Sequence, residues 1–255
     1  MFTRVLVAVD GSRHSLAAAG LAVRVAERTG GQVLALFVKD ARIIHAPYWR
    51  DFGAISLPTA RFDKQLDEFF QSRGEAVLAT LRERHPGLEG VIMEGRVDEA
   101  IVRSARDADL LVMGLAGESH EETGDDEHLG SRVLRIVRKS RRPALLVPDG
   151  DVELRTLRLV FCDAPREDRV GRAASLARAL GLPLVALAVG DYGMEGAGRD
   201  VLSRHGLEAR SAPGDAADAL RGAVEPGDLV LLADDDISDL ERALAGLRVP
   251  VLAYL

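Results

Sequence analysis

Residues 4–12 read Arg-Val-Leu-Val-Ala-Val-Asp-Gly-Ser, an apolar run that ends in an acid, a glycine and a serine. A related run, Arg-Leu-Val-Phe-Cys-Asp-Ala-Pro, stands at 158–165, and the correspondence continues in order along the chain. Residues 108–114 (Ala-Asp-Leu-Leu-Val-Met-Gly) match residues 227–233 (Gly-Asp-Leu-Val-Leu-Leu-Ala). A unit of this size that recurs once indicates a domain duplication, because solenoid units are only about 20–50 residues long.

The apolar runs lack strict alternation and are separated by helical patterns, which predicts parallel strands buried on both faces of a sheet. Residues 148–156 are polar and rich in turn formers, which predicts a linker. We therefore expect an α/β protein with two open, Rossmann-like parallel-sheet domains, over residues 1–148 and 156–255. The expected strands are 4–10, 33–38, 90–94, 109–113 and 143–147, then 158–162, 183–189, 207–211, 228–232 and 249–254.

Composition and charge exclude several classes of function. The net charge of −7 argues against nucleic acid as a partner, because domains that bind it usually carry a basic field. No apolar run approaches the roughly 20 residues that span a bilayer, and the N-terminus enters a strand without a signal-peptide pattern. We expect a cytoplasmic protein with no membrane partner. The single cysteine excludes an internal disulfide.

The carboxyl ends of the first and fourth strands are the expected place for a ligand, since open parallel sheets bind ligands there. Asp10-Gly11-Ser12 follows the first strand and precedes a helix, so we expect a carboxylate and free backbone amides at one spot. Ser12 is expected to cap that helix.

Glycines dominate the segment after the fourth strand. Gly114 and Gly117 follow the strand, and Gly130-Ser131 opens a helix. Glycines let a phosphate approach the backbone closely, and a helix start offers unpaired N–H groups. The pattern predicts an anion site, and Arg132 stands close enough to the helix start to reach a phosphate.

These residues resemble the universal stress protein family in its tandem two-domain form, along nearly all of the chain. The family's Val-Asp-Gly-Ser matches Val9–Ser12, and its Gly-x-x-Gly followed by Gly-Ser/Thr matches Gly114, Gly117, Gly130 and Ser131. The resemblance implies an adenine nucleotide alpha hydrolase-like fold with strand order 3-2-1-4-5 in each domain. It also implies antiparallel pairing of the two last strands in an intramolecular pseudo-dimer.

The resemblance further implies that the protein binds ATP or another adenine nucleotide. By that likeness Asp10 faces the adenosine, Val38 and Met113 flank the base, and the glycines with Ser131 hold ribose and phosphates. The expected nucleotide-binding residues are Ala8, Val9, Asp10, Val38, Met113, Gly114, Gly117, Gly130, Ser131, Arg132 and Val133.

Residues 118–129 depart from the family pattern. Twelve residues separate Gly117 from Gly130, where the family commonly has nine, and six of them are acids while none is Lys or Arg. Such a segment repels a bare triphosphate unless a divalent cation such as Mg²⁺ bridges the two. His120 and His128 lie among the acids, but the segment lacks the oxygen spacing of a hard-cation loop, so we expect no metal site of the protein's own.

The second domain lacks the glycines of the first. It has Asp163-Ala164-Pro165 after its first strand and Ala233 followed by three aspartates, Asp234–Asp236, after its fourth. Acids at a helix start make a good cap and a poor phosphate site. We expect one nucleotide, held by the first domain.

Three functions remain open. The leading one is a nucleotide-responsive binding module in a stress response, with no catalytic residues and with homodimerisation as a further possibility. A ligand-free structural dimerisation protein is the second, favoured by the acidic segment. A slowly ATP-hydrolysing enzyme is the third, although the chain has no Walker motif and no Gly-x-Gly-x-x-Gly after the first strand.

Overall fold

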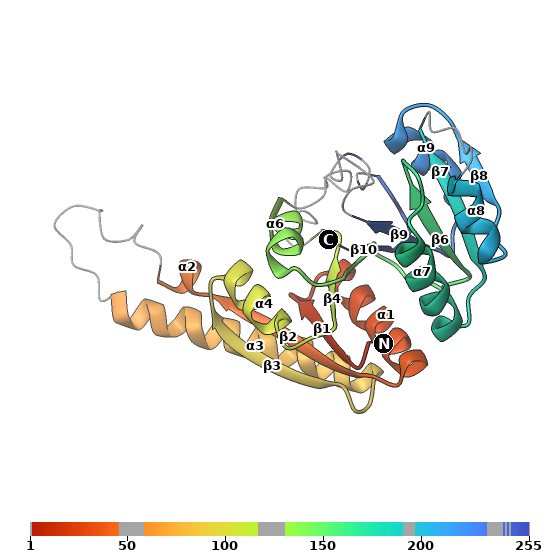
Figure 1. Cartoon of the computed structure of the whole chain (residues 1–255). Coiled ribbons are helices and arrows are strands. Elements are labelled where there is room, and N and C mark those ends of the chain that lie inside the picture. Colours follow the sequence, from red (N-terminus) through yellow and green to blue (C-terminus); the bar gives the residue numbers. More distant parts are fainter. Residues whose placement is uncertain are drawn as a thin grey trace.

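The computed structural model describes residues 2–45, 59–116, 131–190, 197–233, 242, 244 and 246–254. In them a 10-stranded sheet runs through the molecule, with helices on both of its faces (Figure 1). The strands are β1 (Arg4–Val9), β2 (Gln32–Asp40), β3 (Glu89–Gly95), β4 (Leu110–Gly114), β5 (Ala144–Val147), β6 (Thr156–Phe161), β7 (Leu184–Val189), β8 (Ala209–Ala212), β9 (Asp228–Ala233) and β10 (Val251–Tyr254). The helices are α1 (Arg13–Thr29), α2 (Ala41–Ile44), α3 (Thr59–Arg84), α4 (Val97–Ala105), α6 (Ser131–Ser140), α7 (Glu167–Leu180), α8 (Ala197–Arg204) and α9 (Ala216–Ala223).

The strand order is β3-β2-β1-β4-β5-β10-β9-β6-β7-β8, which repeats the order 3-2-1-4-5 in each half of the chain. Strands within a half are parallel, whereas β5 and β10 pair antiparallel, with Leu145 opposite Leu252. The predicted α/β class, the strand order and the antiparallel pairing of the last strands are confirmed. The short helix α2 was not predicted.

Two apolar clusters hold the layers together, one on each face of the sheet. The first joins α1, α3, α7 and α8 to the sheet, and the second joins α4, α6 and α9 to the opposite face. Each cluster contains residues of both halves, so the core is continuous across the β5–β10 junction. All five residues of β4 are buried, as expected of a strand covered on both faces. No helix in the described part of the chain is long and apolar enough to cross a membrane.

An aspartate ties the first strand of each half to the fourth at the amino edge of the sheet. Asp109 Oδ2 accepts hydrogen bonds from Thr3 N (3.0 Å), Thr3 Oγ1 (2.6 Å) and Arg4 N (3.0 Å). These bonds, that of the Thr3 hydroxyl foremost, lower the pKa of Asp109. In the second half Asp228 pairs with Arg158, whose Nη2 lies 2.7 Å from Asp228 Oδ2, and both side chains are buried.

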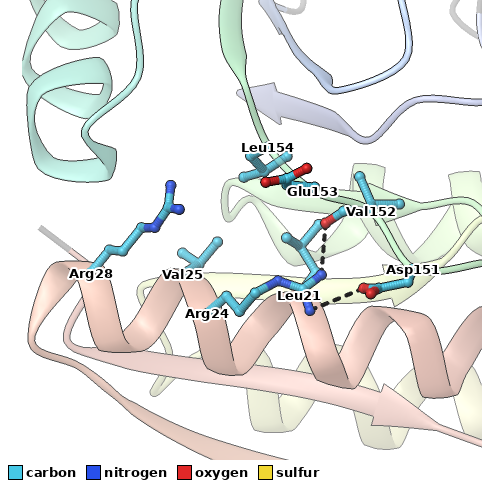
Figure 2. A pocket seen from close by; sticks show the side chains of 8 residues that line it. All are labelled: Leu21, Arg24, Val25, Arg28, Asp151, Val152, Glu153 and Leu154. Atoms are coloured by element: carbon cyan, nitrogen blue, oxygen red, sulfur yellow. Dashed lines mark hydrogen bonds and ion pairs between the residues drawn. The ribbon is translucent and has the colours of Figure 1, made fainter.

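Two arginines of α1 bond the expected linker and the second half. Arg24 donates Nη2 to Val152 O (2.8 Å) and its Nη1 lies 3.3 Å from Asp151 Oδ1, as Figure 2 shows. Arg28 donates Nη1 to Leu180 O at the C-terminal end of α7 (2.7 Å). A cavity of about 250 Å³ remains between α1 and residues 151–154.

The start of α1 packs directly against the end of β4. A Cβ atom at Gly114 would lie 2.8 Å from His14 Cβ and 3.0 Å from the His14 carbonyl carbon, so a larger residue would displace the helix. His14 is buried there (7% exposed), and within the described part of the chain neither of its ring nitrogens has a hydrogen-bond partner. An unpaired buried donor or acceptor costs about 1–3 kcal/mol.

We expect His14→Leu to raise the free energy of unfolding by about 1 kcal/mol, because it removes two unpaired polar atoms and keeps the apolar contacts. His14→Gln is the control that keeps buried polar atoms, and it should not be stabilising. Urea unfolding of the three proteins measures the difference. A lower stability of His14→Leu than of His14→Gln would show that the imidazole has a favourable polar partner.

A protein that comprises residues 1–148 alone should form a homodimer or aggregate, because the fully buried strand β5 would lose its partner β10 and expose an apolar edge. Light scattering coupled to size exclusion measures the mass. A stable, monodisperse monomer would contradict the prediction.

Candidate functional site

The carboxyl ends of β1, β2 and β4 lie side by side, because β1 pairs with both other strands. Val9 is opposite Phe37, and Val7 is opposite Val112, so the next residues of the three strands reach the same edge. Four of the expected site residues pack against one apolar cluster, on the face covered by α4 and α6: Ala8, Val38, Met113 and Val133. Val9 belongs to the cluster on the opposite face. The expected apolar residues of the site therefore share a face, except for Val9.

The turn after β1 satisfies its own backbone amides. Asp10 N and Gly11 N both donate to Ser15 Oγ (3.3 and 3.2 Å), and Ser12 N donates to Asp10 Oδ1 (3.0 Å). The expectation of free amides at Asp10–Ser12 is wrong, because the hydroxyl of Ser15 folds back on the turn. Ser12 Oγ accepts from Ser15 N (3.1 Å), which confirms Ser12 as the N-cap of α1.

Gly114 has a structural reason to be glycine at this edge. The close approach of His14 leaves no room for a side chain, and the next amide, Leu115 N, donates to Val147 O (2.8 Å). Close packing of α1 on β4 therefore requires Gly114 whether or not a phosphate lies beside it.

Part of the expected anion site lies outside the described residues. Gly117 and Gly130 lie outside the described residues, and so do His120 and His128. Ser131 and Arg132 open α6, where the structure describes the backbone alone. Within the described ranges, no group of three or more His, Cys, Asp or Glu side chains could hold a metal ion.

A buried carboxylate fixes α6 against α4. The side chain of Asp98 is 4% exposed, and its Oδ2 lies 3.8 Å from Lys139 Nζ and 4.0 Å from Arg135 Nη1. The structure places both cations beside Asp98. This arrangement orients the helix whose first turn is the expected phosphate contact.

Two residues near the edge were missed by the sequence analysis. His14 is buried against Gly114, and Arg73 of α3 donates Nη2 to Asp10 O at 3.3 Å. Arg73 stands 63 positions from Asp10. No local pattern signals such a contact, because it depends on how α3 packs on the sheet. A histidine next to a helix start gives no sign of burial either.

Known proteins resemble both the first half and the whole chain. The model of the Universal stress protein family matches residues 1–148. A universal stress protein of Thermus aquaticus is 30% identical over 151 residues, which cover 58% of this chain and 99% of that protein. A universal stress protein of Methanocaldococcus jannaschii is 26% identical over 153 residues, covering 58% of this chain and 82% of that protein.

Two solved structures extend the likeness of the fold to the second half. A universal stress protein from Archaeoglobus fulgidus aligns with 98% of this chain and 95% of its own, with a TM-score of 0.63 and 16% identity. A functionally unknown protein from Pseudomonas aeruginosa aligns with 99% of this chain and 92% of its own, with a TM-score of 0.60 and 13% identity. The family model covers more than half of the chain, and the chain belongs to the universal stress protein family.

Proposed function

We propose that the chain binds one adenine nucleotide, ATP or a related one, at the carboxyl edge of its first half and acts as a regulatory module in a stress response. The carrying observation is that Ala8, Val38, Met113 and Val133 pack on one face of the sheet beside the end of β1, where Asp10 stands. Apolar side chains next to a carboxylate suit a base and ribose better than a bare anion.

In this proposal the start of α6 binds the phosphates. Because the amides of Asp10, Gly11 and Ser12 are bonded within their own turn, the turn after β1 offers no anion cradle. In this proposal Gly114, Gly117, Gly130 and Ser131 hold ribose and phosphates, Arg132 contacts a phosphate, and Mg²⁺ lies between the phosphates and the acids of residues 118–129.

The second half has a structural role in this proposal. Its first turn contains Asp163-Ala164-Pro165, and α7 begins after Arg166 without a side-chain cap, whereas α1 is capped by Ser12. We propose two domains, residues 1–148 and 156–255, arranged as an intramolecular pseudo-dimer about the β5–β10 pair. Location in the cytoplasm is part of the proposal.

A ligand-free structural protein is the second candidate. The closed turn at Asp10–Ser12 and the packing role of Gly114 favour it, because both features have a structural explanation without a nucleotide. A measurement of bound nucleotide distinguishes the two candidates.

Titration calorimetry of the full chain with ATP should give a stoichiometry near one, with tighter binding in Mg²⁺ than in a chelator, since a cation offsets repulsion by the acids. A stoichiometry near two would contradict the empty second half, and equal affinity without the metal would contradict the bridging cation. Absence of binding would favour the structural candidate, and sustained turnover of ATP would favour an enzyme.

Gly130→Asp should abolish nucleotide binding, because it adds a side chain and a negative charge where backbone amides are proposed to meet phosphate. Gly171→Asp is the matched control: it makes the same change on α7, where a new Cβ meets nothing within 4 Å. The control should bind like the natural protein. Unchanged affinity of Gly130→Asp would place the phosphates elsewhere.

A further inference from the structure

Helix α3 carries a glycine in its interior, at a point where it packs closely on the sheet. A Cβ atom at Gly74 would lie 2.8 Å from Phe37 Cδ1 and 2.9 Å from Ile92 Cδ1, so a side chain would push the helix away from β2 and β3. Glycine inside a helix costs roughly 1 kcal/mol relative to alanine. The close approach of α3 is therefore a specific feature of this fold.

The residues next to Gly74 on α3 reach the end of β1. Gly11 has a φ of +93°, and a Cβ there would lie 3.0 Å from Val77 Cγ2 and 3.9 Å from Arg73 Nη2. Arg73 Nη2 donates to Asp10 O (3.3 Å). The close packing at Gly74 thus brings a guanidinium group to the backbone of the residue expected to face the adenosine.

Hydrogen bonds reach Asp10 from its own turn and from helix α3. Its N donates to Ser15 Oγ and its Oδ1 accepts from Ser12 N, and both partners belong to the turn that Asp10 itself starts. Its carbonyl oxygen accepts from Arg73, which belongs to another helix. Arg73 therefore bonds the turn to α3 from outside, whereas the two serines bond it from within.

We propose that Arg73 is a positioning residue for nucleotide binding, which acts by fixing Asp10 against the adenosine rather than by touching the phosphates. This inference rests on the proposed function above. If Arg73 acts in this way, its loss lowers the affinity for every ligand that contains adenosine by the same factor. A direct phosphate contact would instead weaken ATP more than adenosine.

The experiment compares the affinities of adenosine, AMP and Mg²⁺–ATP for the natural chain, Arg73→Gln, Asp10→Asn and the double variant. Arg82→Gln, which removes a guanidinium from the same helix farther along, is the matched control, and thermal unfolding monitors the fold of each protein. We expect Arg73→Gln to weaken all three ligands by the same factor, about tenfold, which corresponds to an Asp10 turn that is correctly placed about one tenth of the time before binding. In a chain that already carries Asp10→Asn, we expect Arg73→Gln to lower the affinity little further. We expect Arg82→Gln to bind all three ligands with normal affinity.

Three results would overturn the inference while the natural chain still binds nucleotide. They are unchanged affinity of Arg73→Gln, a loss confined to ATP and AMP, and full additivity with Asp10→Asn. If the natural chain binds none of the three ligands, the proposed function fails and this inference fails with it. A thermal midpoint of Arg73→Gln that falls while its affinity stays normal would assign Arg73 to folding alone and overturn the inference.

Discussion

The rest of the structure depends on the parallel pairing of the first and fourth strands in each half. These pairs are β1 with β4 and β6 with β9. Both pairs are covered by helices on two faces, so their position is fixed by burial and by the aspartates at the amino edge. Asp109 accepts hydrogen bonds from a threonine hydroxyl and two backbone amides, whereas Asp228 accepts one backbone amide, that of Glu225, and pairs with a buried arginine. Breaking a buried pair like Arg158–Asp228 costs about 3–5 kcal/mol. The contact between the first and fourth strands therefore depends on different side chains in the two halves.

The two halves share this framework and differ at the carboxyl edge. In the first half, Ser12 and Ser15 close the turn after β1, and Gly114 admits the start of α1. In the second half, α7 starts without a side-chain cap and Ala233 stands at the end of β9. The framework depends on burial and strand pairing, so the edge residues of the two halves can differ without loss of the fold.

The sequence predicted the strands because continuous apolar runs are what burial on two faces requires, and the strand order followed from the family resemblance. It predicted Ser12 as a cap correctly, but it missed that Ser15 bonds the amides of Asp10 and Gly11. A serine three residues after a cap is compatible with a solvent-facing side chain as well. Arg73 was beyond prediction, because its contact depends on the depth at which Gly74 lets α3 pack.

Helix α1 connects the candidate site with the junction between the halves. Its first turn is bonded to Asp10 and Gly11, and near its other end Arg24 and Arg28 bond residues 151–152 and the end of α7. Its 17 residues span about 25 Å as one rigid rod. Gly114 holds its start against β4 without any intervening side chain, so the helix cannot tilt there without a clash. The Asp10 turn and the arginine contacts at the junction are therefore attached to one rigid element, and the cavity over Leu21 and Val25 lies beside its arginine end.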